Sequence, residues 1–447
     1  MRFILFFLSD SQQSTVNSQH KTFPHTIALT YLRYKNTSAI MTFSILIASS
    51  RRSASVFSLA RANSVMTALQ ASFSTTGTIT STTTSTTTST TMAPESPYYT
   101  VAITGASGML GNALIDELSK KENGQLNGKP LRIVKLTRSN SIEDGLEESE
   151  ATMHINITTL NWNPNAENGS DSINVKALKS IDTLVHLAGE NVGAGLLPGP
   201  LGWLGIQAWS DEKKNRIMNS RVGPTKALAT AIAECPNPTT YIVASGVGVY
   251  GNDFMADDEN DKIAPDESAD ISHTEGFLAE VSRQWEGASQ PAIGEGALSK
   301  NRLVNLRLAP ILSKKGGALG KLHPIFFLGG GGIVGSGKQY FSYISARDAA
   351  RSIVHIMEND SLNGPVNLVA PTAATNADFT YALGRIMVRP TMIPLPGFIV
   401  KLMFGEMGEE MLLGGVKATP KKLMDSGFEF QHENIVKALD SAVNETI

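Results

Sequence analysis

The chain has 447 residues, 41% of them hydrophobic and 39 of them glycine, and its formal net charge at pH 7 is −3. This length allows two or three domains or one large α/β unit with an extension, and the small net charge points to neither a nucleic acid nor an anionic membrane as partner. The single cysteine, Cys235, excludes an intramolecular disulfide and a cysteine-based metal cluster, so we predict no metal site.

Residues 1–97 have the composition of a leader followed by a linker. Between Met1 and Pro94 there is one acidic residue, Asp10, against seven lysines and arginines. Acid-poor, arginine-containing leaders of this kind are typical of organelle transit peptides. We therefore predict import into a mitochondrion, with a plastid as the alternative, and a start at Met41 is a third interpretation.

A tract of serine and threonine at residues 74–91 is interrupted only by Gly77 and Ile79. It cannot bury enough apolar surface to offset the entropy of ordering, so we predict a disordered linker. The apolar run at residues 4–8 is too short to span a bilayer. We expect no integral membrane segment there or later in the chain.

A glycine-rich turn follows the first predicted strand. The apolar run from Tyr98 to Thr104 leads into Gly105, Gly108 and Gly111, and then into an apolar-periodic helix that extends to about Lys121. Such glycines permit a sharp turn, close approach of the backbone to a diphosphate, and close packing of helix on strand. The amides that begin the helix would face the phosphates, where the helix dipole favours negative charge. A ligand-free glycine turn is the alternative.

The second predicted strand, residues 131–136, ends in Thr137-Arg138-Ser139. In dinucleotide folds this strand end faces the adenosine ribose, where an acid would bind the 2′-hydroxyl of NAD and an arginine would bind a 2′-phosphate. Because Arg138 is present and an acid is not, the sequence favours NADP(H) over NAD(H). The alternative is a solvated loop arginine.

Strands and helices then alternate to the end of the chain. Further strands are predicted at residues 153–159, 181–189, 240–245, 303–308 and 366–369, and helices at 211–234, 274–290, 348–358, 376–388 and 397–413. This alternation, without hairpin signals, predicts an α/β fold with a parallel doubly wound sheet. His186 lies on an apolar strand and is interpreted as a core histidine. Asn376 is the predicted N-cap of its helix.

Several motifs together resemble the extended short-chain dehydrogenase/reductases, and more narrowly their atypical subgroup of epimerase family proteins, sometimes labelled cell-division inhibitor. The motifs are Gly105-Ala-Ser-Gly-Met-Leu-Gly111, His186-Leu-Ala-Gly-Glu-Asn191, Ser220-Arg-Val-Gly-Pro-Thr225, Phe277-Leu-Ala-Glu-Val281 with Trp285-Glu286, Arg307-Leu-Ala-Pro, Gly335-Ser-Gly-Lys-Gln339 and Ala374-Thr-Asn-Ala-Asp-Phe379. The resemblance covers about residues 98–439. It implies a Rossmann domain at 98–370, with parts of 250–345 in a cap, and a substrate-side helical segment at 371–447.

The resemblance also implies the cofactor-binding residues. The pyrophosphate is expected at Gly105, Ser107, Gly108, Met109 and Leu110, the 2′-phosphate at Thr137 and Arg138, the adenosine-to-nicotinamide stretch at Leu187 and Ala188, and a polar end of cofactor or substrate at Arg221. The chain departs from the family at residues 343–348, Tyr-Ile-Ser-Ala-Arg-Asp, where the family tends to have Trp-Ile-His and an acid. A substrate contact through that histidine is therefore not expected.

The catalytic residues of the superfamily are missing. A Tyr-x-x-x-Lys pair normally transfers the proton, but the aligned helix has Phe277-Leu-Ala-Glu-Val281. Ser245 is the candidate hydroxyl. Glu190 is the candidate acid or base, with a loop-fixing carboxylate as its alternative, and Tyr250 is interpreted as structural.

Two functions are consistent with these residues. The first is an NADP(H)-dependent oxidoreductase or epimerase-like enzyme acting on an unknown small carbonyl or alcohol. The second is an NADP(H)-binding regulator or scaffold in an organelle, with weak or no catalysis. A small-molecule substrate and a homodimer are the expected partners, and nucleic acid is not.

Overall fold

The computed structural model describes residues 96–139, 147–152, 155–166, 172–193, 209–235, 237, 239–252, 264–294 and 300–444. The predictions of a transit peptide and a linker therefore lie outside the described residues. No helix within the described ranges has the length and apolarity needed to cross a bilayer.

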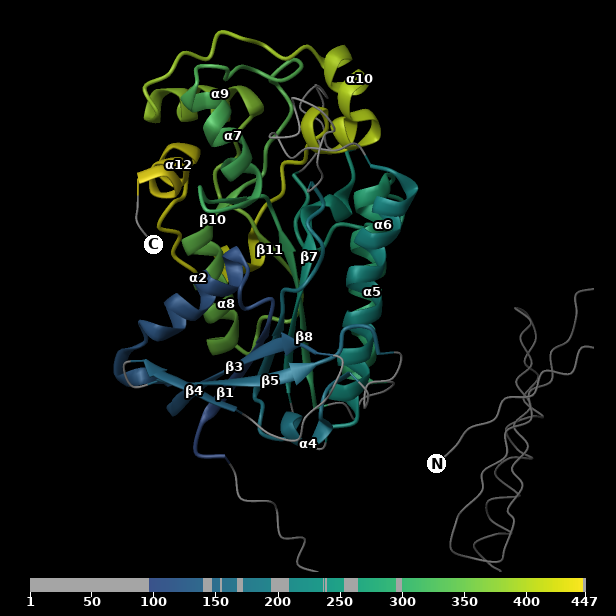
Figure 1. The fold of residues 1–447 in the computed structure, drawn as a ribbon, viewed down its shortest axis with the longest axis vertical. Helices are drawn as coiled ribbons and strands as arrows, with labels where there is room; N and C mark the ends of the chain where they lie inside the picture. Colours follow the sequence, from purple (N-terminus) through teal and green to yellow (C-terminus); the bar gives the residue numbers. More distant parts are fainter. Residues whose placement is uncertain are drawn as a thin grey trace, which may run out of the picture. The chain divides into compact units, whose positions relative to one another are not determined.

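One large sheet organises the chain (Figure 1). Its order is β11 (Gly364–Leu368), β8 (Arg302–Leu308), β7 (Thr240–Gly246), β6 (Thr183–His186), β1 (Tyr99–Thr104), β3 (Lys129–Arg138), β5 (Ile155–Trp162) and β4 (Glu147–Thr152). All neighbours from β11 to β5 pair in parallel. The prediction of a mostly parallel sheet is confirmed.

The expectation of no hairpins is wrong at one edge of the sheet. Strand β4 pairs antiparallel with β5, and β2 (Gln125–Leu126) pairs antiparallel with β3. Asn127 and Gly128 connect β2 to β3 with φ of 50° and 76°. Positive φ at both residues is the geometry of a two-residue hairpin turn, which Asn-Gly favours.

Helices cover both faces of the sheet. On one face, α2 (Met109–Ser119) and α8 (Ala346–Glu358) pack side by side in a core that includes Ile103. On the other, α5 (Asp211–Ala233) and α6 (Phe277–Ser289) pack in a core that includes Ala102. Adjacent residues of β1 thus face opposite helix layers, as expected of a buried parallel strand. The doubly wound fold is confirmed (Figure 1).

The order of strands reverses direction around β1. The chain runs from β1 to β3 and β5 on one side, and then returns to β6 and β7 on the other. At such a switch point the carboxyl ends of two neighbouring strands diverge and leave a crevice where ligands bind. In this chain the crevice lies beyond Thr104 of β1 and His186 of β6.

A third core lies beside the sheet. Here α7 (Gly317–Phe327), α9 (Asn376–Ile386) and α12 (Ile435–Asn444) pack around the short parallel pair β9 (Ile311–Leu312) and β10 (Ile344–Ser345). The helices α7 and α12 were not among the predicted elements. Shorter elements complete the described chain: η1 (Glu122–Gly124), α4 (Val175–Leu178), η3 (Val247–Tyr250), η4 (Gln290–Ile293), α10 (Gly397–Gly408), the π-helical turn η5 (Glu409–Leu413) and α11 (Lys421–Asp425).

The last part of the chain returns to the main core. Leu423 of α11 and the following Phe428 belong to the same buried cluster as Val101 of β1. The predicted N-cap of α9, Asn376, is wrong by one residue: Thr375 is the N-cap and forms a capping box with Asp378. The Asn376 side chain instead accepts a hydrogen bond from the amide of Val334, at 2.9 Å.

Candidate functional site

The glycine turn has the backbone geometry of a dinucleotide fingerprint. Gly105 has φ of 68°, and the amide of Gly108 donates to its carbonyl at 2.9 Å. A Cβ at Gly111 would lie 2.3 Å from the same carbonyl oxygen. Ser107 and Gly108 are exposed where α2 begins at Met109. The first helical turn therefore presents its amides to solvent at the end of β1, as an anion site requires.

Thr104 joins the two strand ends that border the crevice. Its hydroxyl oxygen accepts from the amides of Leu187 at 3.1 Å and Ala188 at 3.3 Å. A Cβ at Gly105 would lie 3.0 Å from the Leu187 carbonyl carbon. Because both backbones approach this closely, Leu187 and Ala188 lie directly beside the glycine turn, as the cofactor prediction requires.

His186 is fully buried next to this junction. Its Nδ1 lies 2.7 Å from the Thr104 hydroxyl, and its ring meets Trp162 edge-on. Burial lowers the pKa of His186 to about 3, so the imidazole is neutral at physiological pH. This arrangement agrees with the interpretation of a core histidine.

Thr137 and Arg138 extend beyond the end of the neighbouring strand. The register pairs Leu136 of β3 with Thr104, the last residue of β1, so the next two residues project past the glycine turn. Both are exposed. The Arg138 guanidinium therefore lies at the same end of the sheet as the crevice. Arg138 is two residues further along β3 than the residue paired with the end of β1.

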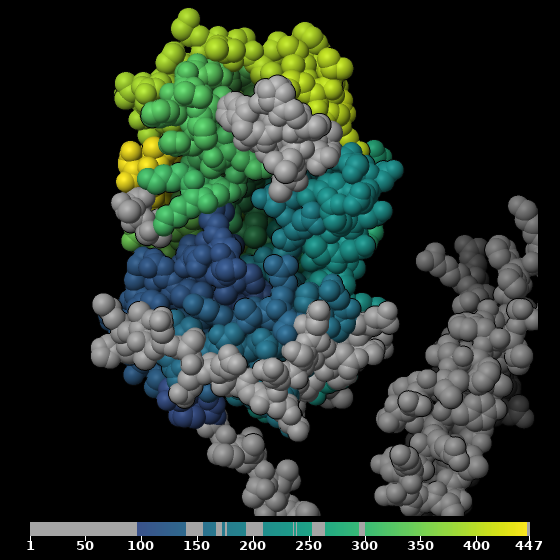
Figure 2. All heavy atoms as spheres, viewed as in Figure 1, coloured from purple at the N-terminus to yellow at the C-terminus, as the bar shows by residue number. Residues whose placement is uncertain are grey.

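Met109 connects this nucleotide-binding region to the cap. Gly316 and Gly317 approach so closely that a Cβ on either would lie 3.7 Å from the Met109 side chain. Figure 2 shows the blue surface of the first strand–helix unit meeting the green surface of α7. The start of α2, where the pyrophosphate is predicted, is therefore covered on one side by the start of α7.

Arg221 lies under the loop that follows β6. Its guanidinium donates to the carbonyl of Glu190 at 2.8 Å and to that of Ile217 at 3.0 Å, and it lies 4.8 Å over the Trp285 ring. Burial lowers the pKa of Arg221 to about 10, which leaves it charged at neutral pH. It fixes the loop backbone and also lines the cavity described below.

The Glu190 carboxylate faces α5. It accepts from the Lys213 ammonium at 2.5 Å, and Arg216 lies 3.4 Å from the same oxygen. The hydrogen bond from Lys213 lowers the pKa of Glu190. The side chain is therefore an ionised partner of a buried lysine.

Ser245 ends β7 and begins a buried polar network. Its hydroxyl donates to the Glu286 carboxylate at 2.9 Å. Arg307 binds both oxygens of that carboxylate, at 2.9 Å and 3.0 Å, and donates to the Tyr250 hydroxyl at 3.0 Å. Tyr250 also donates to Asn367 at 2.7 Å, and burial raises the pKa of Tyr250 to about 12. These contacts support the structural interpretation of Tyr250.

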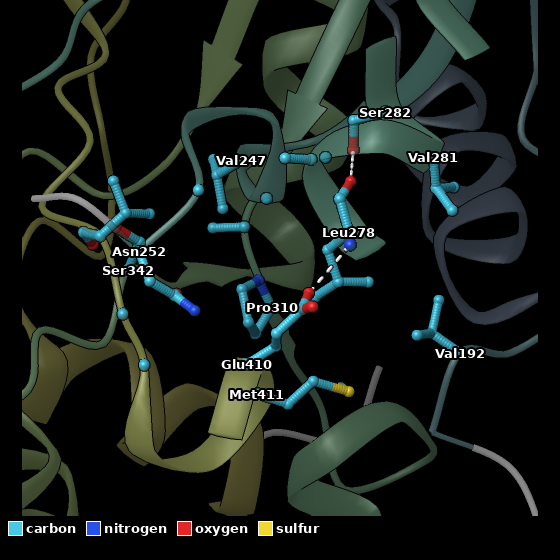
Figure 3. A pocket seen from close by; sticks show the side chains of 18 of the residues that line it. Val192, Val247, Asn252, Leu278, Val281, Ser282, Pro310, Ser342, Glu410 and Met411 are labelled. Carbon is cyan, nitrogen blue, oxygen red and sulfur yellow. Dashed lines mark hydrogen bonds between the residues drawn. The ribbon is translucent and has the colours of Figure 1, made fainter. Parts of the chain in front are cut away.

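A cavity of about 340 Å³ lies beyond the ends of β7 and β8 (Figure 3). Ser245, Leu278, Ser282, Glu410 and Met411 are among its lining residues. Leu278 and Ser282 are four residues apart on α6, so they share one face of that helix, one position along from the aligned Phe277 and Val281.

Phe277, which is aligned with the tyrosine of the superfamily's catalytic pair, is not among the residues that line the cavity. Phe277 packs against Trp209, with ring centroids 4.8 Å apart, while Val281 and Leu278 line the cavity. None of these side chains can transfer a proton. The aligned positions of this helix therefore offer no proton donor to the cavity.

Sequence comparison places the chain in a family. It is 36% identical over 353 residues to an epimerase family protein of Mycobacterium leprae, covering 78% of this chain and 98% of that protein. The chain belongs to the epimerase family. Another member, named chloroplastic, is from Arabidopsis thaliana and is 30% identical, covering 76% of this chain and 85% of that protein.

Solved structures agree with this membership. The human epimerase family protein SDR39U1, determined with NADPH, superimposes with a TM-score of 0.58 at 25% identity, covering 78% of this epimerase family chain and 100% of the human one. A nucleoside-diphosphate sugar epimerase from Corynebacterium glutamicum gives 0.52 at 28% identity, covering 78% and 60%. Residues 395–442 also match a domain of unknown function, DUF1731.

Sequence reasoning missed two features of this site. Glu286 and Arg307 were noted only as parts of motifs, and Glu410 was not singled out. The sequence does single out Arg307. It is the charged residue in the last six residues of β8, Leu-Val-Asn-Leu-Arg-Leu, which otherwise carry no charge. A charge at a buried strand position requires a partner. Nothing local in the sequence indicates which carboxylate that partner is.

Proposed function

We propose that this epimerase family protein binds NADP(H) across the ends of β1, β3 and β6 and is an oxidoreductase or epimerase-like enzyme for a small carbonyl or alcohol. The observation that carries the proposal is the exposed Thr137-Arg138 pair beyond the glycine turn. The NADPH in the human relative supports the same cofactor.

The residues of the crevice fit this cofactor. Gly105, Ser107, Gly108, Met109 and Leu110 would hold the pyrophosphate, Thr137 and Arg138 the 2′-phosphate, and Leu187 and Ala188 the stretch toward the nicotinamide. The close approaches at Gly105 and Gly111 leave room only for glycine, which keeps the turn compact enough for phosphate to reach the amides. When bound, the cofactor supplies or accepts a hydride.

Ser245 is the residue that would meet the substrate oxygen. The Ser245 hydroxyl donates to Glu286, so its oxygen can accept a hydrogen bond from a substrate alcohol, and a substrate carbonyl would take over the hydrogen that Glu286 now receives. Arg307 binds both oxygens of the Glu286 carboxylate, so Glu286 serves to orient the Ser245 hydroxyl. In this proposal water carries the proton to or from the substrate. Glu190, held ionised by Lys213, can accept a proton but has none to donate.

The C-terminal segment completes the substrate side in this proposal. Glu410 and Met411 line the cavity from one side, and Ser245 and Leu278 from another. Residues 371–447 would thus contribute the cap of the site, while residues 98–370 hold the cofactor. We also propose that the chain forms a homodimer, which light scattering of the purified protein would detect.

Arg138→Ala tests the cofactor assignment. Loss of a charge-assisted hydrogen bond costs about 1.5–3 kcal/mol, so the Kd for NADPH should rise about tenfold to a hundredfold while that for NADH changes little. Arg385→Ala, at an exposed arginine on α9, is the matched control. Equal losses for the two nucleotides would refute the 2′-phosphate site.

A second candidate function is an NADP(H)-binding regulator. It is favoured by Leu278 and Ser282, which occupy the cavity face of α6 without a group that ionises near neutral pH. Carbonyl compounds should be screened for NADPH consumption. Turnover that Ser245→Ala abolishes identifies the enzyme, whereas tight NADPH binding with no turnover for any carbonyl identifies the regulator.

We also propose that residues 1–97 direct import into an organelle. A mitochondrion was the first expectation from composition, and the Arabidopsis relative named chloroplastic supports the plastid alternative. A fusion of residues 1–97 to a fluorescent protein in plant cells separates the two. A fusion that begins at Met41 tests the later start.

A further inference from the structure

We infer that the cavity beside Ser245 takes an uncharged, largely apolar carbonyl compound or alcohol and rejects anionic substrates such as nucleoside-diphosphate sugars. This inference rests on the proposed function, because the cavity is the substrate side of that site. It is carried by the side chains that line the cavity and by what their polar groups already bind.

The wall of the cavity is mainly apolar. Its apolar side chains come from several separate parts of the chain and include Val192, Val247, Leu278, Pro310 and Met411 (Figure 3). Pockets of this kind gain binding energy by burying apolar ligand surface, while a few polar groups fix orientation. An apolar carbonyl compound of small size matches such a wall.

Positive charge is scarce in the lining. Among the described residues that line the cavity, Arg221 is the sole cationic side chain. Its donors are directed to the carbonyls of Glu190 and Ile217, and its face covers Trp285. Transfer of an anion from water into an enclosed site is costly unless cations or several donors compensate it. In the described lining a diphosphate would meet this single guanidinium, several of whose donors are already bonded within the protein.

The N-terminus of α6, which borders the cavity, is occupied by the protein's own carboxylate. Glu410 accepts from the amides of Phe277 at 2.7 Å and Leu278 at 2.9 Å, where α6 begins (Figure 3). Gly276 has φ of 104°, and a Cβ there would lie 3.1 Å from the Glu410 carboxylate. The amides that could attract a substrate anion are therefore already neutralised. Glu275 adds a second carboxylate to the lining.

The three serine hydroxyls of the lining are also engaged. Ser282 donates to the Leu278 carbonyl at 2.8 Å, Ser342 to the Val416 carbonyl at 2.6 Å, and Ser245 to Glu286. A sugar brings many hydroxyls, and each one left unpaired on burial costs about 1–3 kcal/mol. A ligand with few oxygens, one of them directed at Ser245, keeps that cost small.

A pair of probes that differ only in charge tests this inference. Methyl benzoylformate and benzoylformate share one carbon skeleton and one ketone, but the second is an anion. Binding of each, and of UDP-glucose, would be measured by calorimetry on the full chain with and without NADPH. We expect the ester to bind at least about tenfold more tightly than the acid, and UDP-glucose to bind more weakly than the ester.

Substitutions at Glu410 make the test specific to the cavity. Glu410→Gln keeps an oxygen for one helix amide and removes the charge, so the preference for the ester should fall severalfold. Glu406→Gln, at a partly exposed residue of α10 paired with Lys214, should leave the preference unchanged. A second variant, Leu278→Arg, places a cation in the cavity and should favour benzoylformate.

The possible failures are distinguishable. Equal or tighter binding of benzoylformate or UDP-glucose, or no binding of the ester, overturns the inference while leaving NADPH binding intact. Absence of NADPH binding, measured separately, instead overturns the proposed function.

Discussion

The hydroxyl of Ser245 donates a 2.9 Å hydrogen bond to the carboxylate of Glu286. This contact connects the cavity to an ion pair that is buried beneath it, since the side chains of Glu286 and Arg307 are only 12% and 4% exposed. Three elements, β7, α6 and β8, are joined through these side chains. The position of the serine therefore depends on a charge pair in the core.

Removing one member of that pair should destabilise the fold strongly. In Arg307→Met the Glu286 carboxylate remains buried without its cation, and we expect a loss of about 3–5 kcal/mol in the free energy of unfolding. Urea denaturation measures the change, with Arg385→Met as an exposed control. A loss as small as the control's would show that the carboxylate finds another partner.

The fingerprint turn should not tolerate a methyl group at Gly111. The added Cβ would lie 2.3 Å from the Gly105 carbonyl oxygen, so Gly111→Ala should cost about 1–3 kcal/mol of stability by overpacking and weaken NADPH binding. Gly223→Ala, at a helical glycine of α5 with nothing within 4 Å, is the matched control. It should be neutral or stabilise by up to about 1 kcal/mol. Thermal unfolding and an NADPH titration check both variants.

His186 should make the protein less stable in acid. Burial lowers its pKa from 6.5 to about 3, so between these values the unfolded chain binds a proton that the folded chain does not. Its contribution is constant above pH 6.5, and stability falls by about 1.4 kcal/mol for each pH unit below it.

The measurement compares unfolding free energies near about pH 6 and about pH 4.5, within that window. In His186→Asn the decline with acid should be shallower by this amount. His273→Asn replaces an exposed histidine whose side chain is 63% accessible, and its decline should match that of the unmodified chain. An unchanged slope in His186→Asn would contradict the buried neutral imidazole.

The cap at α6 should contribute measurable stability. Glu410→Ala removes both hydrogen bonds to the first helical amides, and loss of such a cap costs about 0.5–2 kcal/mol. Glu406→Ala removes only a surface pair with Lys214, worth at most about 1 kcal/mol. Differential scanning calorimetry of the two variants gives the comparison, and equal melting temperatures would argue against the cap.

Local signals in the sequence were sufficient to predict the parallel sheet and NADP(H) as the cofactor, while the residues assigned to it stay predictions. The glycine turn, the Arg138 strand end and the alternation of strands with helices all depend on neighbours within a few positions, and these are visible without a fold. The Asn127-Gly128 hairpin was equally local, and it was missed because two-residue strands such as β2 have no periodicity to detect.

The cavity depends on tertiary packing that no local pattern encodes. The Glu410 carboxylate binds the amide of Phe277, which is 133 positions earlier in the chain. Arg307 of β8 reaches Glu286 of α6 only when α6 packs on β7 and β8 pairs beside β7. The helix α7 follows two glycines and contains Pro324, so its sequence indicates a loop. Its formation is determined by packing of Leu319 and Phe326 in the third core.

The return of Leu423 and Phe428 to the cluster that holds Val101 has a consequence for biosynthesis. The interior of the first strand is sealed by side chains that the ribosome adds more than three hundred positions later. A nascent chain that stops short of these residues leaves part of that interior open to water, so the cluster is completed only after Phe428 has been added.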